Sequence, residues 1–279
     1  MGDYAYYNGR YGKYPEINVT LTDRALFFGD GVYEVMLYRG EVIYQFDEHY
    51  ERLTKSLKAI GISRTPEARA LRSVIYKLCD LSGYSEGIIY LQISASSPSR
   101  THERVESLTY NLLVSVSKYS GYEDKALSLI TVTDRRHGIC NVKSLNLLLS
   151  VLALNEARAV GCDGAVFVRG GTVTEESRSN VSILKSGELI THPTDNYILP
   201  GIMRSNLIRA AGELGIPVIE RGFSISELYG ADEVIISSTT KFVRRVSSID
   251  GHEIKMRDSE RFFSLKERLL LDYFDKCDA

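Results

Sequence analysis

The sequence predicts an α+β fold, because apolar strands and amphipathic helices occur along the whole chain without a regular βαβ alternation. Its 279 residues are 44% hydrophobic and 25% charged, a composition typical of a globular protein with one large domain or two modest ones. Residues 119–125 are polar and aperiodic. We therefore expect an interdomain linker there, a small N-terminal domain over 1–118 and a larger domain over 126–279.

The first predicted domain alternates between strand and helix signals. Apolar residues over 35–44 flank Arg39-Gly40 and predict a hairpin. Apolar residues three and four positions apart predict helices over 47–61 and 68–83, each ended by a glycine. Buried strands are predicted over 88–94 and 108–116.

The second predicted domain continues this mixture. Residues 145–159 have apolar side chains on most faces of a helix, so we expect this helix to be deeply buried. Another helix is predicted over 207–215, where Gly215 ends it, and a short apolar strand over 234–237. Tight hairpins are predicted at Gly170-Gly171, Ser186-Gly187 and Asp250-Gly251.

Charge and cysteine content exclude several classes of protein. The formal net charge is −2, so nothing electrostatic indicates binding to nucleic acid or to an anionic membrane. No apolar run approaches the roughly 20 residues that span a bilayer, and the N-terminus lacks the pattern of a signal peptide. The four cysteines are dispersed and the five histidines lack ligand spacing. We therefore expect no disulfide framework, no metal and a reduced, cytoplasmic location.

Lys143 and Glu175 are candidates for cofactor chemistry. Lys143 lies just before the apolar helix pattern, where it would lose hydration; its pKa would fall, and its neutral amine could form a Schiff base. Glu175 ends a predicted strand and could keep a heterocyclic nitrogen protonated. Taken alone, the first also fits a surface lysine packed along its stem, and the second a solvent-exposed strand end.

Three other features could bind a phosphate. Ile202 and Met203 follow a proline-glycine pair at a predicted helix start, where free N–H groups and the helix dipole favour an anion. Thr239 and Thr240 follow a strand and offer hydroxyl and amide donors, while Arg52 offers a planar cation. A capped helix, a polar turn and a surface arginine are the alternative interpretations.

Arg100 and His102 form a possible carboxylate site. They lie two residues apart in a loop, and an extended chain would point both side chains the same way. Together they could bind a carboxylate, although a solvated basic loop has the same sequence pattern.

In this order, the motifs resemble those of the pyridoxal-phosphate-dependent class IV aminotransferases, which have fold type IV. That family includes branched-chain aminotransferases, D-amino acid aminotransferases and aminodeoxychorismate lyases. The resemblance implies a small α/β domain and a larger domain with a mixed-sheet pseudo-barrel that carries Lys143. The matching segments are Phe28-Gly29-Asp30-Gly31-Val32-Tyr33-Glu34, His49-Tyr50-Glu51-Arg52-Leu53, Lys143-Ser144-Leu145-Asn146, Thr174-Glu175 with Ser179-Asn180-Val181, Gly201-Ile202-Met203-Arg204 and Ser238-Thr239-Thr240.

The resemblance implies a role for each candidate residue around pyridoxal 5'-phosphate. Lys143 carries the cofactor as a Schiff base and shuttles a proton between the substrate α-carbon and the cofactor. Glu175 pairs with the pyridine nitrogen, and Leu199 packs on the ring. The residues implied to hold the phosphate are Arg52, Ile202, Met203, Thr239 and Thr240.

Within the family, the chain resembles the D-amino acid aminotransferases most closely. Tyr33, Arg100 and His102 match their carboxylate trap, whose arginine and histidine come from the partner subunit, so the resemblance implies a homodimer. The implied reaction is transamination between D-amino acids, such as D-alanine or D-glutamate, and 2-oxo acids, such as 2-oxoglutarate or pyruvate. Arg178 stands where this subfamily has a small hydroxyl residue. It could bind a substrate carboxylate near the cofactor or point outward.

Other functions are alternatives on the same scaffold. A branched-chain L-amino acid aminotransferase would make the pair of Arg100 and His102 incidental. An aminodeoxychorismate lyase would share the cofactor residues but eliminate pyruvate. A catalytically silent binding protein is the alternative outside the enzymes, and the presence of Lys143, Glu175 and Arg52 together argues against it.

Overall fold

The computed structural model describes residues 1–104 and 109–278. These residues form two compact units. The first unit contains residues up to Gly121, Val142–Asn146 and the chain end from Asp275; the second contains Tyr122–Asn141 and Leu147–Phe274. The short segment that carries Lys143 therefore groups with the first unit, although its place in the sequence predicted that it belongs to the domain over 126–279.

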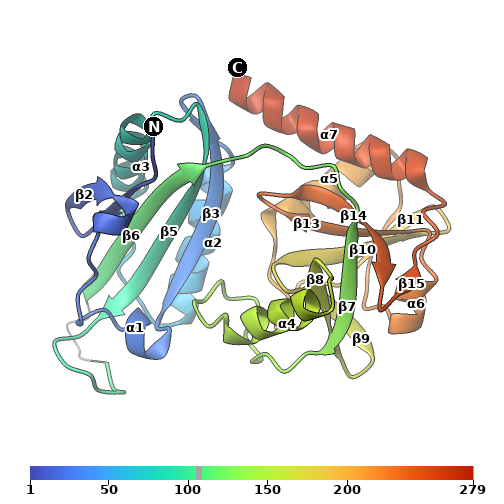
Figure 1. The fold of residues 1–279 in the computed structure, drawn as a ribbon, viewed down its shortest axis with the longest axis horizontal. Coiled ribbons are helices and arrows are strands. Elements are labelled where there is room, and N and C mark those ends of the chain that lie inside the picture. The colour runs from blue at the N-terminus through green and yellow to red at the C-terminus, as the bar shows by residue number, and fades with distance from the viewer. Residues whose placement is uncertain (105–108, 279) are drawn as a thin grey trace. The chain divides into compact units, whose positions relative to one another are not determined.

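The first unit is built on an antiparallel sheet of six strands in the order β2-β1-β6-β5-β3-β4 (Figure 1). The strands are β1 (Tyr4–Tyr7), β2 (Arg10–Lys13), β3 (Gly31–Arg39), β4 (Val42–Ile43), β5 (Glu86–Ser96) and β6 (Thr109–Lys118). The helices are the 3-10 turn η1 (Tyr14–Glu16), α1 (Ala25–Phe28), α2 (Phe46–Ala59) and α3 (Ala68–Ser82).

Helices α2 and α3 pack against one face of this sheet. Strand residues alternate between faces, and those turned toward the helices form one apolar core with the helical leucines. Its members include Leu53, Leu57, Leu71, Ile75, Leu78, Ile89, Leu91, Val114 and Val116. The predicted hairpin, both helices and both strands are confirmed, apart from Leu108, which lies outside the described residues.

The second unit is built on a mixed sheet of nine strands with four helices. The strands are β7 (Leu127–Thr133), β8 (Gly164–Arg169), β9 (Thr172–Glu176), β10 (Ser179–Lys185), β11 (Glu188–Thr191), β12 (Val218–Glu220), β13 (Glu233–Ser238), β14 (Phe242–Ile249) and β15 (His252–Glu253). The helices are α4 (Leu148–Ala159), α5 (Ile202–Glu213), α6 (Ile225–Tyr229) and α7 (Ser259–Asp278).

Six of these strands close into a ring. The path runs β10-β13-β14-β7-β8-β9, and β9 pairs with β10 again, so the ring has no open edge. Apolar side chains such as Val166, Val181, Ile236 and Val246 form a core cluster of this unit. The expected α+β class with a pseudo-barrel is therefore confirmed, and so are the three predicted hairpins.

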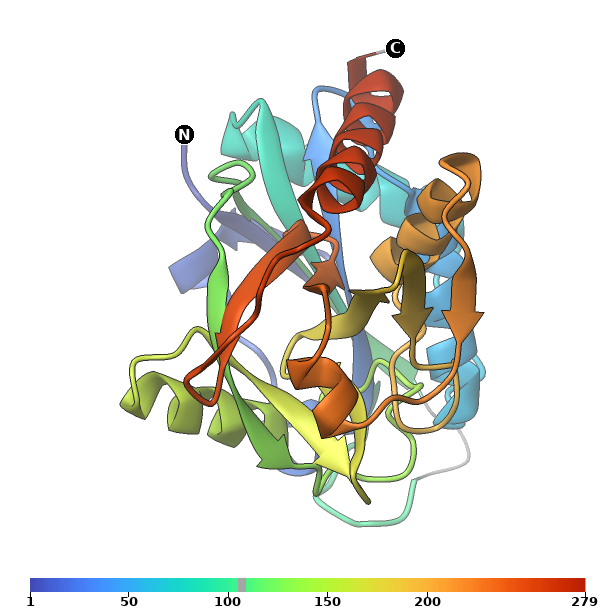
Figure 2. The same ribbon diagram turned by 90° about the vertical axis from the view of Figure 1, so that its right-hand side faces the viewer.

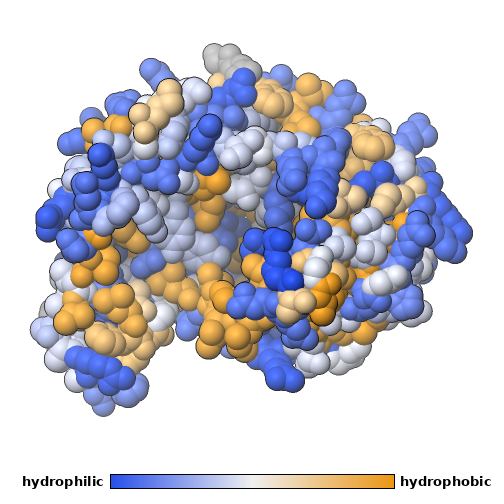
Figure 3. Space-filling view, viewed as in Figure 1, coloured by the Kyte–Doolittle hydropathy of each residue, from blue (hydrophilic) through white to orange (hydrophobic). Residues whose placement is uncertain are grey.

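Helix α4 corrects a prediction. The sequence favoured a deeply buried helix over 145–159, but in α4 only Ala153 and Ala157 are buried, against β8 and β7 (Figure 2). Leu148, Val151 and Leu152 are exposed by 69%, 49% and 52% of their surface. Figure 3 shows apolar surface over this helix. The cause is that small alanines provide the contact face, while the larger residues point away from the ring.

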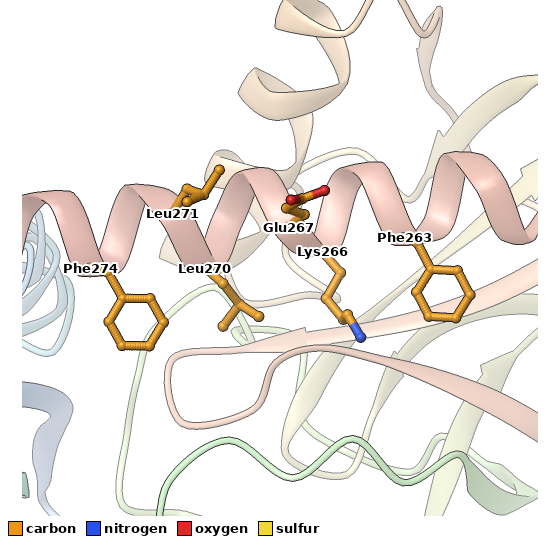
Figure 4. A pocket seen from close by; sticks show the side chains of 6 residues that line it. All are labelled: Phe263, Lys266, Glu267, Leu270, Leu271 and Phe274. Carbon is orange, nitrogen blue, oxygen red and sulfur yellow. The ribbon is translucent and has the colours of Figure 1, made fainter.

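Helix α7 is amphipathic. Its buried side includes Phe262, Leu265, Leu269 and Tyr273. Six further residues of this helix line a pocket; they are Phe263, Lys266, Glu267, Leu270, Leu271 and Phe274 (Figure 4). A helix that could cross a membrane, long and apolar throughout, does not occur in the part of the chain that the structure describes.

Candidate active site

In the first unit, the segment that carries Lys143 lies along the edge of β3. Tyr33 donates its N–H to the carbonyl of Lys143 at 3.0 Å, and Leu145 donates its N–H to the carbonyl of Gly31, also at 3.0 Å. A Cβ on Gly31 would lie 2.6 Å from the carbonyl oxygen of Ile93 and 2.8 Å from Leu145 Cδ1. Only glycine permits this close approach, which fixes the backbone on which Lys143 is presented.

The Lys143 amine lies over an aromatic face. Its Nζ is 4.2 Å from the centroid of the Tyr33 ring, which stacks on Tyr90 at 5.7 Å. The Lys143 N–H also donates to Ser56 Oγ of α2 at 3.3 Å. The structure therefore brings together Lys143, the predicted Tyr33 and the helix that carries Arg52.

Arg52 is held by a buried carboxylate. Its Nε and Nη2 donate to the two oxygens of Glu34 at 2.9 and 2.7 Å, and His49 Nδ1 lies 2.7 Å from Glu34 Oε2. Burial alone would raise the pKa of Glu34, but the charge and hydrogen bonds of Arg52, with those of His49, lower it to about 2. Glu34 is therefore ionised and fixes the guanidinium plane of Arg52.

His49 is buried beside these charges. Burial lowers the pKa of His49, and the positive charges of Arg52 and Lys143 add to this, outweighing the attraction of Glu34. In its neutral form, with Nδ1–H donating to Glu34, His49 presents Nε2 as an acceptor, and this buried atom has no hydrogen-bond partner in the described structure.

Arg100 and His102 gather around Phe28. The Arg100 guanidinium lies 5.3 Å from the centroid of the Phe28 ring, and the His102 ring lies 5.2 Å from it. Arg24, 5% exposed, donates to the carbonyls of Thr101 and His102 at 2.6 and 3.0 Å and holds this loop. Both predicted carboxylate residues are exposed.

In the second unit, Glu175 is buried and surrounded by donors. Its Oε2 accepts from the N–H of Leu199 at 3.0 Å and from Asn180 Nδ2 at 3.4 Å. Its other oxygen forms an ion pair with Arg136. The structure thus brings two predicted residues, Glu175 and Leu199, into direct contact.

Gly201 sets the position of the α5 N-terminus against the hairpin of β9 and β10, which carries Glu175 and Asn180. A Cβ on Gly201 would collide with Asn180 Oδ1, and Asn180 Nδ2 donates to the Leu199 carbonyl at 2.9 Å. Gly201 is the N-cap residue of α5 and supplies no side-chain cap to the amides of Ile202 and Met203. The first turn of α5 also has no acidic residue, so its dipole is not opposed there.

Thr239 and Thr240 extend from β13 next to that hairpin. Asn180 on β10 pairs with Ser237 on β13, and the ladder of β13 with β14 ends at Ser238. Both threonines are half-buried in the following turn. The second unit therefore contributes Glu175, Leu199, the α5 start and this turn from adjacent elements.

Arg136 was not predicted as a site residue. Burial opposes its charge, but the hydrogen bond with Asp134 and the attraction of Glu175 raise the pKa of Arg136. Asp134, in turn, is buried and also lies 3.2 Å from Arg169. The only local signal was the charged run Asp134-Arg135-Arg136 within an otherwise apolar region, which does not identify Glu175 as the partner.

A metal centre has no counterpart in this arrangement. Among residues 1–104 and 109–278, no group of three or more histidine, cysteine, aspartate or glutamate side chains could hold a metal ion.

Comparison with known proteins identifies the family. Residues 31–249 match the model of the class IV amino-transferases, so the chain belongs to this family. It is 36% identical over 251 residues to the D-alanine aminotransferase of Bacillus licheniformis, an alignment that covers 89% of each chain. The predicted family is therefore confirmed.

Solved structures agree in fold. The branched-chain aminotransferase from Thermoproteus uzoniensis with norvaline superposes with a TM-score of 0.87 at 26% identity, over 99% of this chain and 95% of that one. The branched-chain amino acid aminotransferase from Escherichia coli gives a TM-score of 0.86 at 24% identity, over 98% and 94%. A further branched-chain amino acid aminotransferase, solved with pyridoxamine 5'-phosphate, gives 0.88 at 23% identity. The last two similarities show the fold alone.

Proposed function

We propose that this class IV aminotransferase transfers amino groups between D-amino acids and 2-oxo acids, with pyridoxal 5'-phosphate as cofactor. D-alanine and D-glutamate are the expected donors, and pyruvate and 2-oxoglutarate the expected acceptors. The observation that carries the proposal is the similarity to a D-alanine aminotransferase along nearly the whole chain. Branched-chain enzymes resemble the chain in fold at lower identity.

The donors and acceptors of the chain fit this cofactor. A buried carboxylate, Glu175, suits a protonated ring nitrogen, because its neighbours Leu199, Asn180 and Arg136 all stabilise its anionic form. Leu199, fixed by its N–H to Glu175, would pack on the ring. The cofactor, when bound, supplies an electron-accepting ring that stabilises negative charge at the substrate α-carbon.

Phosphate binding would use cations and uncapped amides. We assign Arg52 to it because Glu34 holds its guanidinium in a fixed plane. The amides of Ile202 and Met203 offer donors at a helix start without a competing cap. The hydroxyl groups of Thr239 and Thr240 complete the proposed set.

Lys143 would act both as the attachment point and as the acid–base group. Its Nζ, placed over Tyr33, would take the proton from the substrate α-carbon and pass it to the cofactor, and the amino-acid product of the second half-reaction would receive its α-proton by the reverse transfer. Its backbone is fixed by the hydrogen bonds to β3, so the amine moves only by side-chain rotation.

Arg100, His102 and Tyr33 would bind the α-carboxylate of the substrate. A planar guanidinium binds a carboxylate through two hydrogen bonds, and the side from which it does so selects the hand of the substrate. We propose that Arg100 and His102 serve the site of a second copy in a homodimer. Their exposure supports this, as does the exposed apolar side of α4.

A cytoplasmic location is also proposed. Its support is that Cys79, Cys140 and Cys162 are thiols, as is typical of proteins in a reducing compartment.

Absorption spectra test the function directly. Purified protein loaded with pyridoxal phosphate should be yellow, and the band should shift on adding D-alanine but not L-leucine or L-valine. Borohydride reduction followed by peptide mapping should then place the label on Lys143. A shift with the L-amino acids alone would refute the D-amino acid assignment, and a label on another lysine would refute the role of Lys143.

A further inference from the structure

Two cations from distant parts of the sequence meet at one end of the strand ring. Arg178 lies in the turn between β9 and β10, and Lys241 in the turn between β13 and β14. Because β10 pairs with both β9 and β13, the two turns are neighbours. Each cation follows a residue assigned to the cofactor: Glu175 is on β9, three residues before Arg178, and Thr240 directly precedes Lys241.

A buried carboxylate, Glu176, contacts both turns. Glu176, 2% exposed, accepts the backbone N–H of Arg178 on Oε2 at 3.0 Å, and the same oxygen lies 3.8 Å from Lys241 Nζ. Its Oε1 accepts the Ser177 hydroxyl at 2.5 Å. Glu176 therefore accepts two hydrogen bonds from its own turn, while its distance to Lys241 Nζ is longer than a hydrogen bond.

The positive charges exceed the negative charge here. Lys241 Nζ has one further contact, to Ser179 Oγ at 3.4 Å, so its hydrogen bonds are long. Burial lowers the pKa of Lys241, and repulsion by Arg178 and Arg244 adds to this against the attraction of Glu176 and Asp163. The Arg178 side chain is exposed and forms no hydrogen bond or ion pair with the described residues.

We propose that Arg178 and Lys241 bind the second carboxylate of a dicarboxylic substrate, such as D-glutamate or 2-oxoglutarate. The proposal rests on the proposed function and names the substrate class that this chain favours. An anion between the two side chains would remove their mutual repulsion and use their free N–H donors, the fork of Arg178 and the point charge of Lys241. Arg178 follows the end of the strand that carries Glu175, and Lys241 shares its turn with Thr240, so the cations border the proposed reaction site.

The same anion chemistry could instead serve the phosphate of the cofactor, since Lys241 directly follows Thr240. The two sources make different predictions. Cations for a second carboxylate set the preference for dicarboxylates and leave cofactor affinity alone, whereas cations for the phosphate set cofactor affinity and leave the preference alone.

Equilibrium binding separates these cases without relying on turnover. Glutarate and pentanoate, which have the same number of carbons but carry two carboxylates and one, are titrated calorimetrically into cofactor-loaded protein. We expect Arg178→Ser and Lys241→Ser each to weaken glutarate binding relative to pentanoate by about 10- to 100-fold, the effect of losing a charge-assisted hydrogen bond. Arg178→Lys should recover part of the preference, because it keeps the charge but not the fork.

Arg257→Ser is the matched control. Arg257 is an exposed arginine of the same unit whose side chain also has no hydrogen bond or ion pair with the described residues, so its loss should leave the ratio unchanged. The affinity for pyridoxal phosphate, measured by absorbance titration of each apoprotein, gives the second arm.

The outcomes are distinct. An unchanged ratio of glutarate to pentanoate affinity in Arg178→Ser and Lys241→Ser overturns the proposal, and so does a loss of cofactor affinity with that ratio retained. If the parent protein shows the glutarate preference and the variants lose it, the proposal holds. Turnover with D-amino acids is measured separately, so its absence would count against the proposed function and not against this anion site.

Discussion

Glu34 and Arg52 face each other through two parallel hydrogen bonds, with Arg52 Nε 2.9 Å from Oε1 and Nη2 2.7 Å from Oε2 of the carboxylate. Both side chains are buried. The pair therefore couples the stability of the first unit to the orientation of Arg52, which is proposed to bind the cofactor phosphate.

Replacing Glu34 by Gln should destabilise the protein by about 3 kcal/mol, because it leaves the buried Arg52 without its counter-charge. Urea unfolding at pH 7 measures this. A matched variant of an exposed pair, Glu51→Gln beside Lys55, should cost less than about 0.5 kcal/mol. Equal effects of the two substitutions would show that the buried pair contributes no more than a surface pair.

The same pair predicts a pH dependence. The pKa of Glu34 is lowered from 4.5 to about 2 on folding, so its contribution is fully present above the unfolded value and is lost as the pH falls toward the folded value. The difference in unfolding free energy between the parent and Glu34→Gln should be constant above pH 5 and shrink between pH 4.5 and 2. A difference that grows on acidification would contradict this assignment.

Lys143→Ala should lower kcat by at least about 10²-fold, because it removes the proposed proton-transfer group. Stopped-flow half-reactions with D-alanine measure it, and the absorption band of covalently attached cofactor should be lost. Lys185→Ala, at the end of β10, is the control and should keep both band and rate. Retention of the band in Lys143→Ala would show that another lysine carries the cofactor.

Mixed dimers test whether Arg100 serves the partner. Arg100→Ala alone should lower kcat/KM by about 10- to 100-fold, since a bidentate charge-assisted contact is lost. Chains with Arg100→Ala and chains with Lys143→Ala, expressed together, should regain about a quarter of the parent activity. About half of the dimers are then mixed, and each mixed dimer has one intact site of two. The doubly substituted chain is the control, and no recovery in the mixture would place Arg100 with its own Lys143.

Gly201→Ala should weaken cofactor binding by about tenfold. The added Cβ would collide with Asn180 Oδ1 and push this side chain off Leu199 and Glu175, with the loss of about one hydrogen bond. Gly212→Ala is the control in the same helix: nothing lies within 4 Å of its Cβ, so it should raise stability and leave binding unchanged. Equal cofactor affinities in the two variants would show that the start of α5 does not contribute to cofactor binding.

Much of the fold could be predicted from local patterns, and some was overlooked. The hairpin of β1 and β2, with its Asn8-Gly9 turn, was not among the predicted elements, although this dipeptide is a strong hairpin signal. Helix α7 shows apolar residues at Phe262, Leu265 and Leu269, spaced for one helix face, and was also not predicted.

The site was predictable only where it depends on residue order along the chain. The order of the motifs and their resemblance to the class IV family indicated Lys143, Glu175 and Arg52 as candidates, whereas the partners that orient them come from other elements. Neither the contact of Arg136 with Glu175 nor that of Lys241 with Glu176 follows from periodicity, because each depends on strand register. The prediction that α4 is deeply buried was wrong for a related reason: the sequence of a helix that is apolar on most faces does not indicate which face packs against the protein.

The ring of strands is closed between β9 and β10 by two residue pairs, Ser179 with Glu176 and Asn180 with Glu175. Because so short a pairing has few backbone hydrogen bonds, we expect local opening of the ring to begin there. A cofactor bound to Glu175 would stabilise the pairing of β9 with β10. Hydrogen exchange at the Asn180 amide should therefore slow when pyridoxal phosphate is bound. The stability of this strand pairing would then report whether the cofactor site is occupied.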